Sequence, residues 1–250
     1  MVEEKRLDTL FYELASEDRI AILKELCQSH LKMQDIARKL DLTATEASRQ
    51  LQRMSQAKLL ERGPEGTYST TQLGKLLLTL SVSMELVYKN DDYFLVHDLT
   101  QIPLPFINRI GELSHAALIA DLNLDLARWE VLIKNAEDHV WVMTPQAMGH
   151  LSRLMADRLL GGIKLRSIFC ENIREAKASL PSGKNVERKL LPTVPVIMIV
   201  SEKEASVSFP RLDGNVDYQS FFGSDSTFLK WANDLYLHYW EQAKVWYFSP

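Results

Sequence analysis

Residues 31–74 carry the pattern that most constrains the fold, because helical spacing there gives way to short alternating runs. A first helix is predicted from apolar residues at helical intervals, namely Met33, Ile36, Ala37 and Leu40. A turn follows at 41–43, and Thr43 is expected to cap the next helix in a capping box with Glu46. Two strands are then expected at 59–62 and 67–70, joined by a glycine-proline turn. This order of elements predicts a winged helix-turn-helix, mostly α with a β-hairpin wing.

The second helix of this motif has two chemically different faces. Its apolar stripe consists of Ala47, Leu51 and Met54. The opposite face therefore carries hydroxyl, amide and guanidinium groups, which hydrogen-bond base edges and phosphates. We expect bases to be read by Thr45, Ser48, Arg49 and Gln52, and phosphates to be contacted by Thr43, Arg53 and Arg62. The alternative is a helix-turn-helix that serves only packing or dimerisation.

Charge favours DNA as the partner of this segment. Between Leu31 and Arg62 seven basic residues stand against four acidic ones, whereas the whole chain has a net charge of −4. Because phosphate affinity scales with the charges brought to the backbone, so modest a patch predicts tight binding only as a dimer with two half-sites. A helix predicted at 72–92 offers a dimer seam through Leu73, Leu76, Leu77, Leu80, Met84 and Val87. The alternative is that this stripe packs only on the chain's own second domain.

Composition excludes several other classes. No apolar run approaches the ~20 residues of a membrane span, and the N-terminus lacks the hydrophobic core of a signal peptide. The cysteines, Cys27 and Cys170, are far apart, which favours a reducing cytoplasm. Cys27 and His30 offer two of the about four ligands that zinc needs. We therefore expect Cys27 to be buried and structural, and expect no metal and no cofactor.

The remaining chain predicts further helices and an α/β domain. Two amphipathic helices are expected at 7–14 and 18–26, the second capped by Ser16 and exposing Arg19. After prolines at 103 and 105, helices are expected from Phe106 to about Leu118 and at 126–136. The order strand 139–144, helix 146–160 and strand 163–169 is a βαβ unit with parallel strands. A central strand at 195–200, a hairpin partner at 205–209 and a helix at 226–245 follow. The expected division is a winged domain at 1–75, a linker and dimerisation helix at 76–105, and an α/β domain at 106–250.

Polar residues at the strand ends suggest a ligand site in this second domain. Ligands bind at the carboxyl ends of parallel strands, where Thr144, Gln146 and Glu171 are expected. Arg188, from the preceding loop, and Asp217 and Tyr218 could reach the same cleft and orient a small polar or anionic ligand. The alternative is a loop salt bridge beside a core tyrosine. His97 and the tryptophans 141, 231 and 240 are expected to be structural.

The first third of the chain resembles the ArsR-like winged-helix regulators of archaea and bacteria. The segments that carry this resemblance are LASEDRIAILKEL, DIARKLDLTATEASRQLQRMSQAKLL and the wing. Metal-sensing members have a cysteine pair on the helix before the recognition helix, which here reads MQDIARKL and has none. Metal sensing is therefore not expected.

Residues 92–244 resemble the archaeal FilR-type regulators of methanogens. The segments concerned are YFLVHDLTQIPLPFINRIGEL, LLPTVPVIMIVSEKEASVSFP, GNVDYQSFFGSD and FLKWANDLYLHYW. This resemblance implies a transcription regulator with a C-terminal sensor domain whose effector is undefined.

The order HVWVMTP, helix, GGIKLRSIF, apolar strand and terminal helix is similar to the phospholipase D-like fold, which TrmB-type sugar-responsive regulators share. The catalytic form of that fold needs a histidine nucleophile, a lysine two residues later and an aspartate five further on. The corresponding strand here offers Val194, Val196 and Ser201. We therefore expect an α/β domain of phospholipase D-like architecture without catalytic residues, and a chain that is not an enzyme.

Together these features predict a cytoplasmic, homodimeric archaeal transcription regulator that binds double-stranded operator DNA and touches no membrane. A small-molecule effector or a signalling partner would act on its C-terminal domain and bias the orientation of the two winged domains. One alternative is a degenerate phospholipase D-like phosphodiesterase with the winged helix as a docking module. Another is an adaptor that receives a signal from a kinase or a second regulator.

Overall fold

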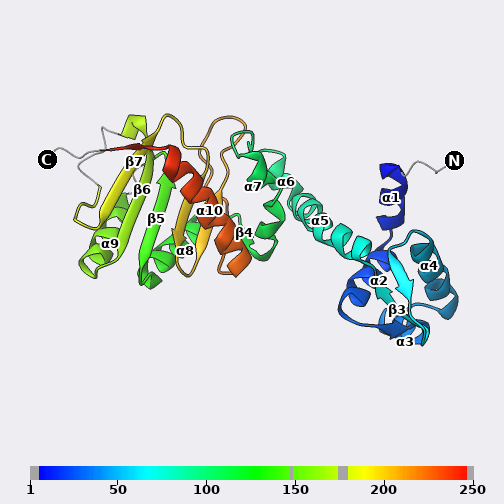
Figure 1. Ribbon diagram of the computed structural model, residues 1–250. Helices are drawn as coiled ribbons and strands as arrows, with labels where there is room; N and C mark the ends of the chain where they lie inside the picture. The colour runs from blue at the N-terminus through cyan, green and yellow to red at the C-terminus, as the bar shows by residue number, and fades with distance from the viewer. Residues whose placement is uncertain (1–5, 147–148, 174–179, 247–250) are drawn as a thin grey trace. The chain divides into compact units, whose positions relative to one another are not determined.

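The computed structural model describes residues 6–146, 149–173 and 180–246. The chain divides into two compact units, residues 1–82 and 83–250 (Figure 1). The division lies within helix α5 (Gln72–Lys89), so the segment 76–105 is shared between the two units. Within the described residues, none of the helices combines the length and apolarity that crossing a bilayer requires.

The first unit is a winged helix-turn-helix. Its elements are α1 (Leu7–Leu14), α2 (Glu17–Gln28), β1 (Leu31–Lys32), α3 (Met33–Lys39), α4 (Ala44–Gln56), β2 (Leu60–Arg62) and β3 (Thr67–Thr70). The strands form an antiparallel sheet of order β1-β3-β2. The predicted helix pair and hairpin are confirmed, and β1 is an additional strand that the sequence did not predict.

Local chemistry explains where the helices of this unit begin. The Thr43 hydroxyl accepts from the Glu46 N–H, and the Glu46 carboxylate accepts from the Thr43 N–H at 3.0 Å, so the predicted capping box is confirmed. Ser16 caps α2 as predicted, by accepting from the Arg19 N–H. The core contains the apolar stripes of α2 and α4 with the start of the wing: Ile22, Leu23, Leu26, Ile36, Leu51, Met54, Leu59 and Leu60.

Two expectations for α2 are wrong. Arg19 is buried, because its guanidinium donates to the carbonyls of Tyr12 and Glu13 and to Oε1 of Gln50. Helical spacing predicted an exposed position because it does not show acceptors on other elements. Here α1 and α4 supply hydrogen-bond acceptors, so the guanidinium can be buried. Cys27 is exposed, because it lies on the side of α2 away from the core.

The second unit is a mixed α/β structure. Its helices are α6 (Asp91–Phe94), α7 (Leu104–Ile107), the 3-10 helix η1 (Ile110–His115), α8 (Leu122–Asn135), α9 (Gly149–Leu160) and α10 (Ser226–Gln242). Its strands are β4 (Ala117–Ile119), β5 (His139–Thr144), β6 (Lys164–Cys170), β7 (Val186–Leu191), β8 (Ile197–Ser201), β9 (Ala205–Ser208), β10 (Ser220–Gly223) and β11 (Lys244–Val245). The sheet order is β11-β7-β6-β5-β8-β9-β10-β4. Strands β5, β6 and β7 are parallel, which confirms the predicted βαβ unit, and β8 and β9 form the predicted hairpin.

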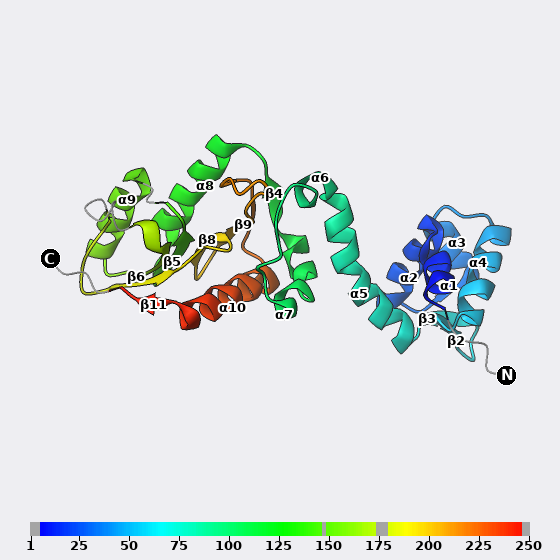
Figure 2. The same ribbon diagram turned by 90° about the horizontal axis from the view of Figure 1, so that it is seen from above.

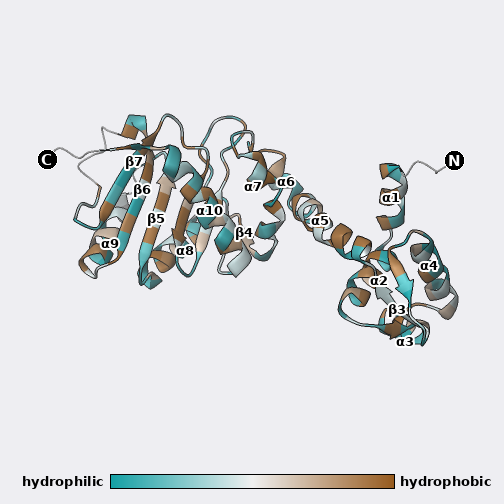
Figure 3. Ribbon diagram, in the orientation of Figure 1, coloured by the Kyte–Doolittle hydropathy of each residue, from teal (hydrophilic) through white to brown (hydrophobic). Residues whose placement is uncertain are grey.

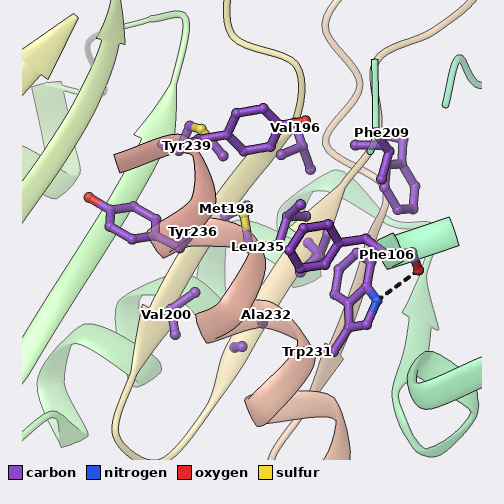
Figure 4. Packing of buried hydrophobic residues seen from close by; sticks show 14 of the residues in the cluster. Phe106, Val196, Met198, Val200, Phe209, Trp231, Ala232, Leu235, Tyr236 and Tyr239 are labelled. Atoms are coloured by element: carbon purple, nitrogen blue, oxygen red, sulfur yellow. Dashed lines mark hydrogen bonds between the residues drawn. The ribbon is translucent and has the colours of Figure 1, made fainter. Parts of the chain in front are cut away.

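Helices cover both faces of this sheet. Figure 2 shows α8 and α9 on one face and α10 on the other. The α10 face buries the larger core, in which Trp231 packs against Phe106 and donates from Nε1 to the Phe106 carbonyl at 3.1 Å (Figure 4). The α8 and α9 face buries a second core that includes Trp129, Val142 and Ile199.

Two predictions for this unit are wrong in detail. The helix expected from Phe106 to about Leu118 is instead a short α7, the 3-10 helix η1 and strand β4. A regular helix is disfavoured here because Gly111 has a low helix propensity and its N–H donates to the Ser83 Oγ at 3.1 Å. Gly111 also packs closely on Ser83, since a Cβ at Gly111 would lie 2.7 Å from the Ser83 Oγ. Arg188, expected in a loop, lies on β7, whose sequence VERKLL lacks the clean alternation that marks a strand.

Candidate nucleic-acid interface and ligand cavity

Helix α4 exposes the residues predicted to read bases. Thr45, Ser48, Arg49 and Gln52 are all exposed, whereas Ala47, Leu51 and Met54 are buried. The helix therefore has one face committed to the core and one open to a partner, which is the arrangement that a recognition helix needs in a major groove.

Arg53 does not belong to this open face. Its Nε and Nη2 donate to the two carboxylate oxygens of Glu13 at 2.7 and 2.8 Å, and its guanidinium lies 4.4 Å from the centre of the Tyr12 ring. The hydrogen bond from Arg53 lowers the pKa of Glu13 from its ordinary value. Arg53 thus joins α4 to α1, which corrects the expectation that its guanidinium contacts phosphates. The sequence could not show this, because Glu13 lies on another helix.

The buried Arg19 strengthens the same junction. Its donors reach two carbonyls at the end of α1 and the Gln50 side chain of α4, the last at 3.2 Å. The orientation of α4 within the first unit is therefore set by two arginines as well as by its apolar stripe.

The wing keeps one predicted cation available. Arg62 is exposed near the end of β2, and its guanidinium lies 5.7 Å from the centre of the Tyr68 ring on β3. Gly66 has φ 81°, a left-handed conformation that suits glycine in the turn between the strands. Thr43 is exposed at the start of α4, with its hydroxyl engaged in the capping box.

The second unit contains a small cavity between the sheet and helices α8 and α9. Its volume is about 30 Å³. The apolar part of its lining comes from α8, α9 and the strands: Trp129, Val142, Leu151, Met155, Leu165, Phe169, Leu180, Pro181, Ile197, Met198 and Ile199. The polar part consists of Thr144, Gln146, Ser152, Ser167 and Arg188.

Three of the six predicted ligand residues line the cavity, and a fourth contacts its lining. Thr144, Gln146 and Arg188 line it directly. Tyr218 donates from its hydroxyl to the Gln146 Oε1 at 3.0 Å and packs edge-on against Trp129, with ring centroids 5.8 Å apart. Ser167 was missed, although its place between Leu165 and Phe169 on a predicted strand is a signal that could have found it.

The other two predicted ligand residues lie elsewhere. Glu171 is exposed and is not part of the cavity lining formed by the described residues. The Asp217 carboxylate lies 3.4 Å from the Arg211 guanidinium and 3.3 Å from His97 Nε2. It therefore links His97 to the loop at 211–217 and does not line the cavity formed by the described residues. This corrects the expectation that Asp217 and Arg188 share a cleft. The side chain of Asp217 contacts Arg211, whereas that of its neighbour Tyr218 contacts the cavity residue Gln146.

The sequence also missed a buried carboxyl group. Asp125 of α8 is fully buried and accepts from the Ser220 hydroxyl, at 2.5 Å, through Oδ1. Its Oδ2 is buried without a hydrogen-bond partner among the described residues. Burial raises the pKa of Asp125 to about 7, against the opposing effect of the Ser220 hydrogen bond.

Comparisons with known proteins reveal likeness of fold. No protein-family model matches this chain, and no curated protein matches its sequence. The structure of TrmBL2, an archaeal chromatin protein, is similar over 96% of this chain and 99% of that one, with 12% identity and a TM-score of 0.44. An IclR homolog from Microbacterium sp. strain HM58-2 is similar over 90% of this chain and 94% of its own, with 14% identity and a TM-score of 0.26.

The similar structures also include enzymes. Human N-acetylserotonin methyltransferase in complex with SAM is similar over 76% of this chain and 67% of that one, with 12% identity and a TM-score of 0.24. A pericyclic reaction enzyme is another. The expectation that the chain is not an enzyme does not stand, because missing phospholipase D residues exclude that one chemistry only.

Proposed function

We propose that this chain is a DNA-binding transcription regulator whose second unit responds to a ligand. The observation that carries the proposal is the division of α4 into a buried apolar stripe and an exposed face of hydroxyl, amide and guanidinium groups. Arg49 and Gln52 offer bidentate hydrogen bonds to guanine and adenine, and Thr45 and Ser48 offer single ones. Arg62 on the wing and Thr43 at the start of α4 contact phosphates.

The protein acts as a homodimer that pairs through α5. Leu73, Leu76, Leu80, Met84 and Val87 recur along α5 at intervals of three or four residues and are 38–59% exposed. Figure 3 shows hydrophobic bands along this helix. Near its end, Met84, Val87 and Tyr88 border an apolar groove of about 590 Å³. An exposed apolar stripe of this length is typical of a partner interface, and a second copy supplies an identical stripe.

The proposal includes the FilR-type arrangement suggested by the sequence, in which one domain binds operator DNA and the second senses an effector. The cavity lined by Thr144, Gln146 and Arg188 is the place where an effector binds in the second unit. A ligand there changes the balance between dimer conformations that differ in half-site spacing.

The test is binding of the full chain to duplex DNA. A binding sequence is first selected from a random duplex library, and affinity is then measured by fluorescence anisotropy. Arg49→Ala should weaken binding to the selected duplex at least tenfold while leaving its circular dichroism and oligomeric state unchanged, because one bidentate base contact contributes about 1–3 kcal/mol.

The matched control is Arg38→Ala, since Arg38 is an exposed arginine of α3 that pairs with Asp35 at 2.7 Å. Its effect should be less than threefold. Equal affinities of the wild type and Arg49→Ala would remove α4 as the reading helix. If the library yields no selected sequence, the regulator proposal itself fails.

A further inference from the structure

We propose that an open groove along β4, at the edge of the large sheet, binds a free α-amino acid with an apolar side chain. Arg128 binds the carboxylate of this ligand, and Glu204 binds its ammonium group. The groove shares no lining residue with the cavity that Thr144 and Arg188 line, so it is a separate site. The inference goes beyond the proposed function and does not depend on it.

The groove lies at the end of the sheet. It is bordered by β4, the first half of α8, the end of β10 and the residue before β9. Among the described strands β4 is the last of the sheet and pairs with β10, and Figure 2 shows α8 beside them. The volume of the groove is about 540 Å³. This lies within the range of about 300–1,000 Å³ that is typical of small-molecule sites.

Arg128 brings an available guanidinium to this groove. It is exposed on α8, and its guanidinium carbon lies 5.7 Å from the centre of the Phe222 ring. That contact involves the flat side of the guanidinium group or its edge with the ring, and it consumes no N–H donor by a hydrogen bond. Within the part of the chain that the structure describes, Arg128 forms no hydrogen bond and no ion pair. A guanidinium in this state can bind both oxygens of one carboxylate.

Glu204 brings a carboxylate without a partner to the same groove. It is half-buried directly before β9, and its Oε2 is buried with no hydrogen-bond partner among the described residues. No ion pair joins it to Arg128, although both residues line the groove. A carboxylate that is partly removed from water without a donor costs free energy, and an ammonium group that donates to it offsets this cost.

The register of the sheet places the two charges near one another. Phe222, which Arg128 contacts, pairs with Ser206 of β9. Glu204 lies two residues before Ser206, and residues two apart along an extended chain share a face. The cation and the anion therefore border the same end of the groove. An α-amino acid carries both of its charges on one carbon atom and can contact both side chains, whereas a peptide separates its terminal charges.

The remaining lining determines the kind of side chain that the ligand carries. Ile119, Leu124 and Phe222 provide apolar surface, and Leu124 is 50% exposed, so an apolar side chain that covers it gains from burial. Asp121 is exposed at the start of α8, where its Oδ1 accepts from the Leu124 N–H at 2.9 Å. The negative charge of Asp121 disfavours an acidic side chain. Leucine, methionine and phenylalanine therefore fit the groove, and aspartate does not.

The test is isothermal titration of the full-length protein with L-leucine, L-methionine and L-phenylalanine. At least one of them should bind saturably. Its N-acetyl derivative lacks the positive charge and its carboxamide lacks the negative charge, so each should bind at least tenfold more weakly. L-Aspartate and the tripeptide of the same amino acid should also bind at least tenfold more weakly, because of Asp121 and of the separated terminal charges respectively.

Two substitutions assign each charge of the ligand to its partner. Arg128→Met should weaken binding of the amino acid at least tenfold and leave the affinity of the carboxamide unchanged. Glu204→Gln should weaken binding of the amino acid at least tenfold and leave that of the N-acetyl derivative unchanged. The matched controls are Arg153→Met on α9 and Glu130→Gln on α8, which lie outside the groove lining and should bind the amino acid as the wild type does.

The outcomes distinguish this site from the proposed function. If Glu204→Gln does not fold, Arg128→Met and the two derivatives decide, because Arg128 is exposed. Absence of saturable binding by all three amino acids, equal binding of either derivative or of the tripeptide, or a control as impaired as Arg128→Met would overturn the proposal. Selection of a DNA sequence by a chain that binds no amino acid would overturn only this site, and the reverse result would overturn only the regulator.

Discussion

Asp125→Asn should remove a large part of the pH dependence of the second unit's stability. Asp125 is fully buried, and burial raises its pKa from 3.8 to about 7. A carboxyl group with a raised pKa keeps its proton in the folded state after the unfolded chain has lost it. Its contribution to the free energy of unfolding is therefore fully present below about pH 4 and is lost as the pH rises through about 7. Asparagine has nearly the same shape and does not titrate in this range.

The size of the effect follows from the shift. A rise from 3.8 to about 7 is a shift of about three units, and each unit corresponds to 1.36 kcal/mol. Asp125 should therefore lower the free energy of unfolding by about 4 kcal/mol between pH 3 and pH 8, of which about 2.5 kcal/mol falls between pH 5 and pH 8. The neighbouring groups Asp217 and Tyr93 are present in both proteins, so their contributions largely cancel in the difference.

Urea unfolding followed by tryptophan fluorescence measures this effect in the second unit alone. All five tryptophans, at 129, 141, 231, 240 and 246, belong to residues 83–250. The difference in unfolding free energy between Asp125→Asn and the wild type should change by about 2.5 kcal/mol from pH 5 to pH 8, in favour of the variant at high pH. Asp157→Asn, on the exposed part of α9, is the control and should show no such change. Parallel pH profiles for the wild type and Asp125→Asn would refute the argument.

Further substitutions test three individual contacts. Arg53→Ala and Glu13→Gln should each destabilise the first unit to a similar, modest extent, because both break the same partly exposed pair, and a urea denaturation curve of the full chain by circular dichroism measures this. Leu80→Asp should convert the dimer to a monomer in sedimentation velocity, whereas Lys75→Asp, on an exposed polar position of the same helix, should not. Gly111→Ala should destabilise the second unit by about 1–3 kcal/mol in urea, because the new methyl group would collide with the Ser83 Oγ at 2.7 Å; a loss below 0.3 kcal/mol would show that the contact yields freely.

The sequence predicted those parts of the fold that depend on near neighbours. The capping box of Thr43 and Glu46 spans three residues, and the stripe of Ala47, Leu51 and Met54 spans two turns of one helix. The parallel pair β5 and β6 was predicted because a helix and a glycine stop lie between two apolar runs. In each case the chemistry that determines the element lies within the element itself or beside it.

Two failed predictions and one missed carboxyl group depend on partners far away in the chain. Arg19 is buried because Gln50, 31 residues later, supplies one of its acceptors. Arg53 is removed from the DNA face by Glu13, 40 residues earlier. Asp125 is hidden in an amphipathic helix, and its hydrogen-bond partner Ser220 is 95 residues later. Helical spacing says which face of a helix is apolar, but it does not say which polar groups will meet that face.

The ligand cavity was predicted in part, since some of its residues depend on near neighbours and others on distant ones. Placing Thr144 and Gln146 at the end of a parallel strand needed only the βαβ pattern, and the structure puts both in the cavity lining. Arg188 reached the same cavity from a strand that was not predicted. Asp217 was expected beside Tyr218, but its side chain is held by Arg211 and His97. Two adjacent loop residues can therefore direct their side chains to different parts of the fold.

The loss of Arg53 from the DNA face makes the dimer more important to the proposed function. Arg49 on α4, Lys58 between α4 and β2, and Arg62 on the wing are exposed and form no ion pair within the described residues. Arg38 and Lys39 on α3 instead pair with Asp35 and Glu25. Each neutralised phosphate contributes about −0.9 to the slope of log affinity against log salt, so one copy gives a slope near −3 and two copies give a slope near −5. Anisotropy titrations with the selected duplex between about 50 and about 200 mM salt distinguish the two values. A slope near −3 with unimpaired sequence preference would mean that a single copy suffices, and the α5 seam would then have no role in DNA affinity.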